Sequence, residues 1–271
     1  MFTYTKCLVF GVAAVVSALV AGCSKDKTGT GAGGVPLVKA GALVTCTHLP
    51  YPPFQIEKDG KIVGFDVDVI DLVAKKLGVK QEFVDTQFEN MKTGAFLNSG
   101  QCDLVAAGMT ITEPRKKNLD FSDPYFDANQ ALIVKKGAGV TNLENLKTSG
   151  KKVGTQSQTT GEDFTKSKGF NPVSFDSSDA LLSGLKSGQV DSVIEDHPVV
   201  QSWMKDSGNA ASFDIVAYLD TGEQLGFAVK KGNAKLVAAI NEVLKEARAD
   251  GTYKRLYEQW FGPQPTNVTK P

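Results

Sequence analysis

The chain has 271 residues with 30 basic and 30 acidic side chains, so its formal net charge is zero. A neutral balance gives no electrostatic basis for binding nucleic acid, and two histidines beside four cysteines give few ligands for a metal. The composition therefore predicts neither a metal nor a cofactor. A chain of this length can bury two hydrophobic cores of ordinary domain size.

Residues 1–22 have the features of a secretory signal peptide. One charge, Lys6, precedes an apolar run from Cys7 to Ala21 that is too short and too rich in small residues for a membrane span. The run ends in Leu19-Val20-Ala21-Gly22-Cys23, which resembles a lipobox. The pattern predicts cleavage before Cys23 and a lipid on its thiol; the alternative is an ordinary signal peptide cut elsewhere.

Residues 23–34 follow this junction and contain Ser, Lys, Thr and Gly with no large apolar side chain. This composition predicts a flexible tether between the membrane anchor and the folded part. No second apolar stretch is long enough to span a bilayer, so we expect translocation to belong to another chain.

Strands and helices are predicted to alternate along the rest of the chain. Apolar residues from Val67 to Leu77 recur at helical spacing and stop at Gly78, which predicts a helix over 66–77. The other predicted helices are 89–98, 161–167, 179–187, one entered through Pro198, 234–250 and a short one ending at Trp260; the predicted strands are 43–46, 79–84, 104–107, 131–134, 152–155, 172–175, 192–195 and 227–230. Such alternation favours an α/β fold with parallel sheets covered by helices.

A candidate anion site follows the strand 104–107. Gly108 lets backbone approach a ligand closely, Thr110 offers a hydroxyl, and Arg115 offers a planar fork that matches a carboxylate. Loops at the strand ends of such sheets converge on a ligand crevice. The alternative is a structural turn in which Arg115 pairs with Glu113 or Asp120.

The segment from Gly108 to Tyr125 is similar to the signature of the family 3 extracellular solute-binding proteins, the polar amino-acid receptors of ABC importers. Similar matches run from about Val44 to Gly262. They are Tyr51-Pro52-Pro53-Phe54, Gly64-Phe65-Asp66-Val67-Asp68, Val153-Gly154, Asp191 with Asp196, Gly226–Asn233, Ala249–Tyr253 and Trp260-Phe261-Gly262.

The resemblance implies a type II periplasmic-binding-protein-like fold. Its two α/β lobes, each a parallel-rich sheet flanked by helices, are joined by two hinge strands, here near 126–130 and 218–223. Lobe 1 is expected to comprise residues 35–127 and 222–262, and lobe 2 residues 128–221. Residues 263–271 form a tail. The ligand is expected between the lobes of a monomer.

The resemblance also assigns roles to residues of lobe 1. Tyr51 and Phe88 match the aromatic pair that sandwiches the ligand's carbon chain. Gly108 is expected to offer its carbonyl to the α-ammonium group, Thr110 its hydroxyl and amide, and Arg115 its guanidinium to the α-carboxylate.

From lobe 2, Thr159 and Thr160 match a loop at a helix N-terminus that completes the carboxylate site. Asp196 matches the carboxylate that holds the α-ammonium. Charged partners of both signs would select a free amino acid, because a buried charge without a partner costs several kcal/mol. Each of these residues can alternatively serve only as a helix N-cap.

Three further residues are candidates for side-chain specificity. His48 replaces the acidic residue that many family members have three positions before Tyr51, Gln158 lies where Gly is usual, and Glu195 precedes Asp196. The missing acid argues against a Lys or Arg receptor, and His48 beside Gln158 favours a Gln, Asn or Glu side chain. An exposed His48 with no role in binding is the alternative.

A disulfide is predicted between Cys46 and Cys102. Cys7 would leave with the signal peptide and Cys23 would carry lipid, so these two cysteines remain. In the family's fold their strands run side by side, and an oxidising compartment favours the bridge. Two buried thiols are the alternative.

These observations predict a lipid-anchored, extracytoplasmic receptor that is not an enzyme. It would capture a free polar amino acid and deliver it to the permease and ATPase subunits of an ABC importer. One rival function is an enzyme similar to cyclohexadienyl or arogenate dehydratases, with Glu195 or His48 as general acid. The other is a sensor that reports the ligand to a membrane partner.

Overall fold

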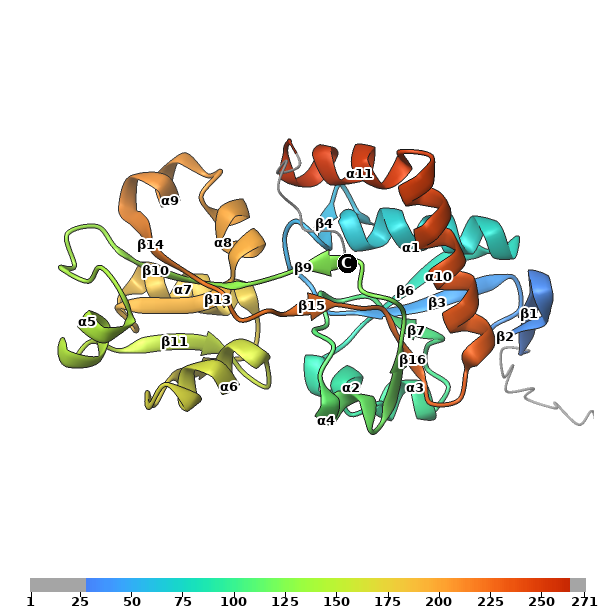
Figure 1. The fold of residues 1–271 in the computed structure, drawn as a ribbon, viewed down its shortest axis with the longest axis horizontal. Helices are drawn as coiled ribbons and strands as arrows, with labels where there is room; N and C mark the ends of the chain where they lie inside the picture. Colours follow the sequence, from blue (N-terminus) through green and yellow to red (C-terminus); the bar gives the residue numbers. More distant parts are fainter. Residues whose placement is uncertain (1–27, 264–271) are drawn as a thin grey trace, which may run out of the picture.

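The computed structural model describes residues 28–263. The predicted signal peptide, Cys23 and residues 264–271 lie outside the described residues. Two lobes lie side by side, and two short chain segments cross between them (Figure 1). Each lobe is built on a five-stranded sheet, so the α/β two-lobe fold expected from the sequence is confirmed.

Lobe 1 contains a sheet with the strand order β6-β3-β7-β16-β8. The strands β3, β6 and β7 are parallel, whereas β16 is antiparallel to both β7 and β8. The bounds are β3 Ala42–Thr47, β6 Lys80–Asp85, β7 Leu104–Val105, β8 Leu119–Phe121 and β16 Ala228–Lys230.

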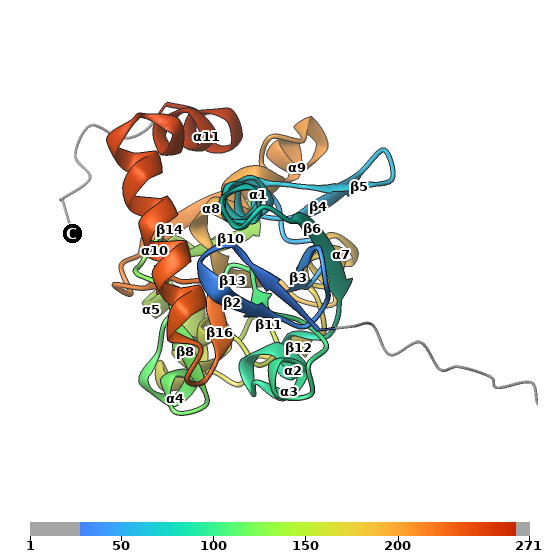
Figure 2. The ribbon, with the colours of Figure 1, turned by 90° about the vertical axis from the view of Figure 1, so that its right-hand side faces the viewer.

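Helices cover both faces of this sheet because its strands are apolar on both sides. Leu43 and Leu104 belong to the core beneath α1 (Phe65–Leu77) and α10 (Ala234–Ala249), whereas Val44 and Val105 belong to the core beneath α2 (Phe88–Lys92) and α3 (Ala95–Asn98). Figure 2 shows α1 and α10 on one side of the sheet, with α11 (Thr252–Phe261) beside them, and α2 and α3 on the other.

Lobe 2 contains a sheet with the strand order β12-β11-β13-β10-β14. The strands β11, β12 and β13 are parallel, and β10 is antiparallel to β13 and β14. The strand bounds are β10 Gln130–Lys135, β11 Val153–Gln156, β12 Val173–Phe175, β13 Ser192–Asp196 and β14 Phe213–Leu219; the helices are α5 Leu143–Thr148, α6 Thr160–Ser167, α7 Ser178–Ser187, α8 His197–Trp203 and α9 Ser207–Ser212.

Smaller elements complete the described chain. They are β1 Gly29–Gly31, a 3-10 turn Ala32–Gly34, β2 Val35–Leu37, the hairpin β4 Ile56–Lys58 with β5 Lys61–Val63, α4 Glu113–Lys116, and the paired strands β9 Phe126–Asp127 and β15 Gln224–Leu225. None of the helices within residues 28–263 is long and apolar enough to cross a membrane.

Three sequence-based expectations about local structure are wrong. The sheets are mixed rather than parallel, because β10 and β16 run against their neighbours. The predicted helix 89–98 is two helices, since Gly94 adopts a left-handed conformation with φ of 77°. The predicted flexible tether is ordered from Gly29 onwards, where β1 pairs with β2.

The two crossing segments are tied to each other between the lobes. The strands β9 and β15 pair in antiparallel fashion, and the Oδ1 atom of Asn129 accepts hydrogen bonds from the amides of Thr221 and Gly222, each at 3.1 Å. Within lobe 2, β10 and β14 are antiparallel neighbours. The first connection therefore runs from lobe 1 into lobe 2 and the second returns beside it, as two adjacent hinge strands.

Aromatic side chains fix the lobe 1 end of these connections. The Phe126 ring of β9 lies 5.1 Å from Phe54, 5.6 Å from Tyr257 and 4.7 Å from Phe261, measured between ring centroids. Such aromatic contacts stabilise beyond the area that they bury. The C-terminal helix α11 is therefore part of the support for the first hinge strand.

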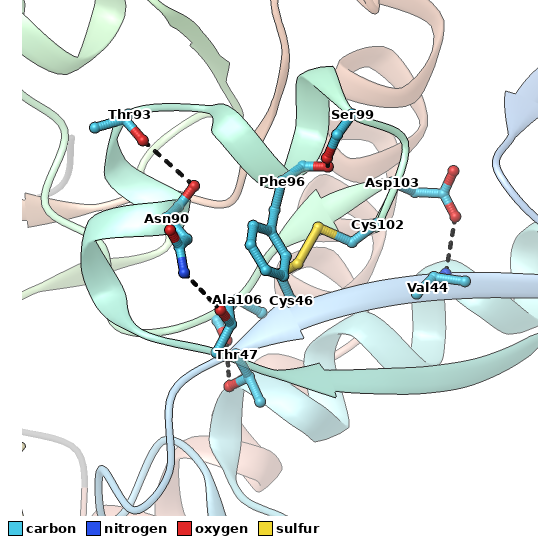
Figure 3. Close-up of a disulfide and its surroundings, with 11 residues drawn as sticks. Val44, Cys46, Thr47, Asn90, Thr93, Phe96, Ser99, Cys102, Asp103 and Ala106 are labelled. Carbon is cyan, nitrogen blue, oxygen red and sulfur yellow. Dashed lines mark hydrogen bonds between the residues drawn. A yellow bond between two sulfur atoms is a disulfide. The ribbon is translucent and has the colours of Figure 1, made fainter.

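A disulfide joins Cys46 of β3 to Cys102 just before β7, with 5.7 Å between the Cα atoms (Figure 3). The predicted pairing is confirmed. The bridge lies in the core beneath α2 and α3, where Phe96 packs against the same cluster. It ties together the two strands whose ends lead to Tyr51 and Gly108.

The bridge should be measurable as a loss of free thiols. We predict that the denatured, unreduced protein has no reactive thiol from Cys46 or Cys102, and that reduction lowers the free energy of unfolding by up to about 4 kcal/mol through loop-closure entropy. An Ellman assay and urea unfolding with and without reductant are the measurements. The Cys46→Ala/Cys102→Ala double variant is the control, because its stability should not respond to reductant. Two reactive thiols in the unreduced mature domain, prepared without Cys7 and Cys23, would contradict the bridge.

Candidate functional site

A narrow cavity lies between the lobes. All eight residues to which the resemblance assigned binding roles line it, together with the specificity candidates His48 and Glu195. Gln158, the third specificity candidate, is absent from its lining, and three residues not singled out from the sequence are present: Gln55, Ala107 and Gln156. Among the described residues, no cluster of His, Cys, Asp or Glu is arranged to hold a metal ion.

Arg115 provides a buried positive charge at this cavity. Its side chain belongs to the short helix α4, the residue is 8% exposed, and its Nη1 donates to the carbonyl of Thr110 at 2.8 Å. The guanidinium lies 5.1 Å from the centre of the Phe88 ring. A guanidinium has five N–H donors, so most of its hydrogen-bonding capacity is unused within residues 28–263.

Arg115 does not form the ion pair with Glu113 or Asp120 that was the alternative expectation. Glu113 pairs with Lys116 at 2.9 Å, and Asp120 pairs with Lys231 at 2.9 Å. Within the described part of the chain, no carboxylate lies in ion-pair distance of Arg115. Burial lowers the pKa of the Arg115 guanidinium, which shows that its charge is poorly solvated where it stands.

Asp196 provides a buried negative charge on the lobe 2 side. Its Oδ2 accepts from the Tyr51 hydroxyl at 2.6 Å and its Oδ1 from Gln130 Nε2 at 2.5 Å. Asp196 stands at the N-cap position of α8, but its side chain makes no capping hydrogen bond. Burial, with the nearby Glu223 charge, raises the pKa of its carboxyl. A cation beside it would reverse that effect.

The N-terminus of α6 faces the same cavity through its first residues. Thr159 is the N-cap: its Oγ1 accepts from the Glu162 amide at 3.2 Å and donates to the Gln156 carbonyl at 2.7 Å. The one proton of its hydroxyl is therefore already donated and is not available to a ligand. Thr160 instead lies with its Oγ1 3.2 Å from that of Thr110, across the interface between the lobes.

Gly108 is held in place by a buried carboxylate that sequence reasoning missed. Its amide donates to Asp66 Oδ2 at 3.0 Å, and burial raises the pKa of Asp66 to about 7. Asp66 lies in the first turn of α1, inside the Gly-Phe-Asp motif. The sequence feature that could have identified Asp66 is its place in the Gly64-Phe65-Asp66 motif at the start of a predicted helix.

The specificity candidates are placed differently from what the sequence suggested. His48 is buried rather than exposed, and its ring nitrogens lie 2.9 Å from the Thr86 carbonyl and 3.2 Å from the Asp176 carbonyl. The Gln158 side chain accepts a hydrogen bond from Lys92. The expected preference for a Gln, Asn or Glu ligand was based on His48 and Gln158, and these contacts no longer support it.

Comparison with known proteins agrees with this architecture. The profile of the bacterial extracellular solute-binding proteins, family 3, matches residues 43–263. A relative from Escherichia coli strain K12, a putative ABC transporter arginine-binding protein 2, is 35% identical over 254 residues, which cover 91% of this chain and 98% of the relative. The chain thus belongs to the bacterial extracellular solute-binding proteins, family 3.

Solved structures show the same fold. An ancestral arginine-binding protein is 46% identical, and its structure is known with glutamine and with arginine bound. The TM-scores are 0.76 and 0.75, and each match covers 82% of this chain and 98% or 99% of the ancestral chain. An ancestral amino-acid-binding protein described as a precursor of cyclohexadienyl dehydratase is 36% identical, with a TM-score of 0.74 over 82% of this chain and 96% of that one.

Gly108 should be indispensable for the shape of the cavity. Its φ is 57°, and a Cβ there would lie 2.6 Å from Cε1 of Tyr51. We predict that Gly108→Ala displaces the Tyr51 ring and weakens amino-acid binding at least 30-fold. Gly60→Ala is the matched control, because Gly60 also has a positive φ, 70°, but open space around its Cβ position. Calorimetry on both variants is the measurement, and equal binding by both would disprove the close-contact argument.

Proposed function

We propose that this protein captures a free polar α-amino acid between its lobes and delivers it to an ABC importer. Arg115 would bind the α-carboxylate, with Thr110, Thr160 and the N-terminus of α6, and Asp196 would bind the α-ammonium. The observation that carries this proposal is that a buried guanidinium, which has no carboxylate partner within residues 28–263, and a buried carboxylate on the other lobe line one cavity. A zwitterion neutralises both.

The names of similar proteins support the same class of ligand. The Escherichia coli relative is named for arginine binding and for an ABC transporter, and the ancestral protein is known with both arginine and glutamine bound. Tyr51 and Phe88 would enclose the carbon chain of such a ligand, and Gly108 would contribute its carbonyl to the ammonium group.

Catalysis is the less supported alternative. One structural neighbour is a precursor of a dehydratase, but it is itself described as amino-acid-binding. A general acid must reach the substrate, and both ring nitrogens of His48 lie against backbone carbonyls. We therefore propose a binding protein that is not an enzyme; prephenate turnover by the purified protein would overturn this.

We call the two proposed contacts, of Arg115 with the α-carboxylate and of Asp196 with the α-ammonium, the charge clamp. Conservative substitutions of these two residues test it. We expect Arg115→Lys and Asp196→Asn each to weaken binding of the preferred amino acid at least 100-fold, since the first loses the fork geometry and the second leaves a buried ammonium unpaired, at a cost of about 3 to 5 kcal/mol. A melting-temperature screen of the twenty amino acids identifies the ligand, and a ligand at a hundred times its Kd adds about 2.7 kcal/mol.

Calorimetry with that ligand then compares the variants. Arg255→Lys and Asp179→Asn are controls for the same substitutions at exposed positions on lobe 1 and lobe 2. Binding within a few-fold of wild type in both clamp variants would refute the proposed site, and a screen in which no amino acid raises the melting temperature would refute the function.

We also propose that the mature protein is anchored to the membrane through lipid on Cys23, on the periplasmic or outer face of the cytoplasmic membrane. The support is the lipobox-like junction at Cys23. We predict that Cys23→Ser moves the protein from the membrane fraction to the soluble fraction. Intact mass spectrometry of the native protein checks this directly, and a mature chain without a lipid increment would contradict the anchor.

A further inference from the structure

Three buried oxygen acceptors at the interlobe cavity have no hydrogen-bond partner within residues 28–263. They are Oε1 of Gln55, Oε1 of Gln156 and Oε2 of Glu195. The three residues are 1%, 4% and 4% exposed, and all three line the cavity. Buried polar atoms are almost always satisfied by protein, water or ligand, so three acceptors without a protein partner in one cavity give a bound donor-rich group a place to bind.

For Gln55 and Glu195 the unpaired acceptor does not depend on a chosen side-chain orientation. Gln55 Nε2 donates to the His48 carbonyl at 3.3 Å, so a reversed amide would place two oxygens against each other. Glu195 carries only oxygens. Its Oε1 is used, by the Asp196 amide at 2.8 Å and the Tyr51 hydroxyl at 3.2 Å, which leaves Oε2 for a ligand.

The charges of the cavity lead to the same conclusion. If an amino acid matches Arg115 with its α-carboxylate and Asp196 with its α-ammonium, the carboxyl of Glu195 remains buried without a counter-charge. Burial, together with the Asp196 charge, raises the pKa of Glu195. Among ligand side chains, a cation would remove this cost, whereas a second carboxylate would increase it.

We infer that Glu195, Gln55 and Gln156 form a side-chain subsite for a cationic, donor-rich group, a guanidinium, on the amino acid held by Arg115 and Asp196. This inference rests on the proposed function. Gln55 comes from lobe 1 and the other two residues from lobe 2, so such a side chain would contact both lobes.

The donor inventory separates the candidate side chains. A guanidinium presents five N–H groups, an ammonium three, a terminal amide two together with an acceptor, and a carboxylate none. By charge and number of donors the subsite therefore ranks arginine first, lysine second, glutamine below both and glutamate last.

The experiment uses a pair of ligands that differ in charge but hardly in shape, L-arginine and L-citrulline. Calorimetry with the mature protein should show arginine binding at least 100-fold more tightly than citrulline. Glu195→Gln, which keeps the shape of the side chain, should weaken arginine binding at least 30-fold and citrulline binding less than threefold. Glu144→Gln makes the same substitution at an exposed position of lobe 2 and should change neither.

The outcomes distinguish this inference from the proposed function. If glutamine, glutamate or citrulline binds as tightly as arginine, and Glu195→Gln leaves arginine binding unchanged, the subsite is wrong while amino-acid capture stands. If none of the twenty amino acids binds the wild-type protein, the proposed function fails. Folding of Glu195→Gln is verified independently by citrulline or glutamine binding at wild-type strength.

Discussion

The rest of this site depends on one buried charge, the guanidinium of Arg115, which has no carboxylate partner within residues 28–263. Taking such a charge out of water is expensive, and most of the Arg115 donors have no partner in the described chain. Its nearest support is the Thr110 carbonyl and the Phe88 ring. Residues 28–263 thus leave the Arg115 charge without an ion-pair partner, and an anion bound beside it would supply one.

The fold keeps the complementary charge on the other lobe. Arg115 follows β7 in lobe 1, and Asp196 ends β13 in lobe 2, so one ligand can satisfy both only when the lobes are in contact. In the structure the lobes touch through Tyr51 with Asp196 and through Thr110 with Thr160. Two adjacent connecting strands, supported on the lobe 1 side by Phe126 and α11, leave rotation about the hinge as the simplest relative motion.

The sequence predicted most of the fold, and it singled out Arg115 and Asp196, which line one cavity in the structure. The helical stripe ending at Gly78 and the motif from Gly108 to Arg115 are local patterns, and local patterns survive in the folded protein. The direction of a strand within its sheet cannot be read from a local pattern. The apolar strands β10 and β16 pair in antiparallel fashion with β13 and β7, which are distant in the sequence. Sequence patterns therefore described elements better than they described sheets.

The side-chain subsite was beyond sequence reasoning for a different reason. Gln55 and Gln156 are ordinary polar residues at the ends of a turn and a strand, and only tertiary packing buries their oxygens without partners. His48 misled because its ring meets the Asp176 carbonyl from the other lobe, 128 positions away. A hydrogen bond of that separation has no counterpart in a local pattern.

Small-angle scattering measures most directly whether one ligand neutralises charges on two lobes. The radius of gyration should fall when the preferred free amino acid is added to the ligand-free protein. It should stay unchanged with the methyl ester, which removes the α-carboxylate charge, and with the Nα-acetyl derivative, which removes the α-ammonium. A decrease of equal size with all three compounds at saturation would contradict the clamp between Arg115 and Asp196.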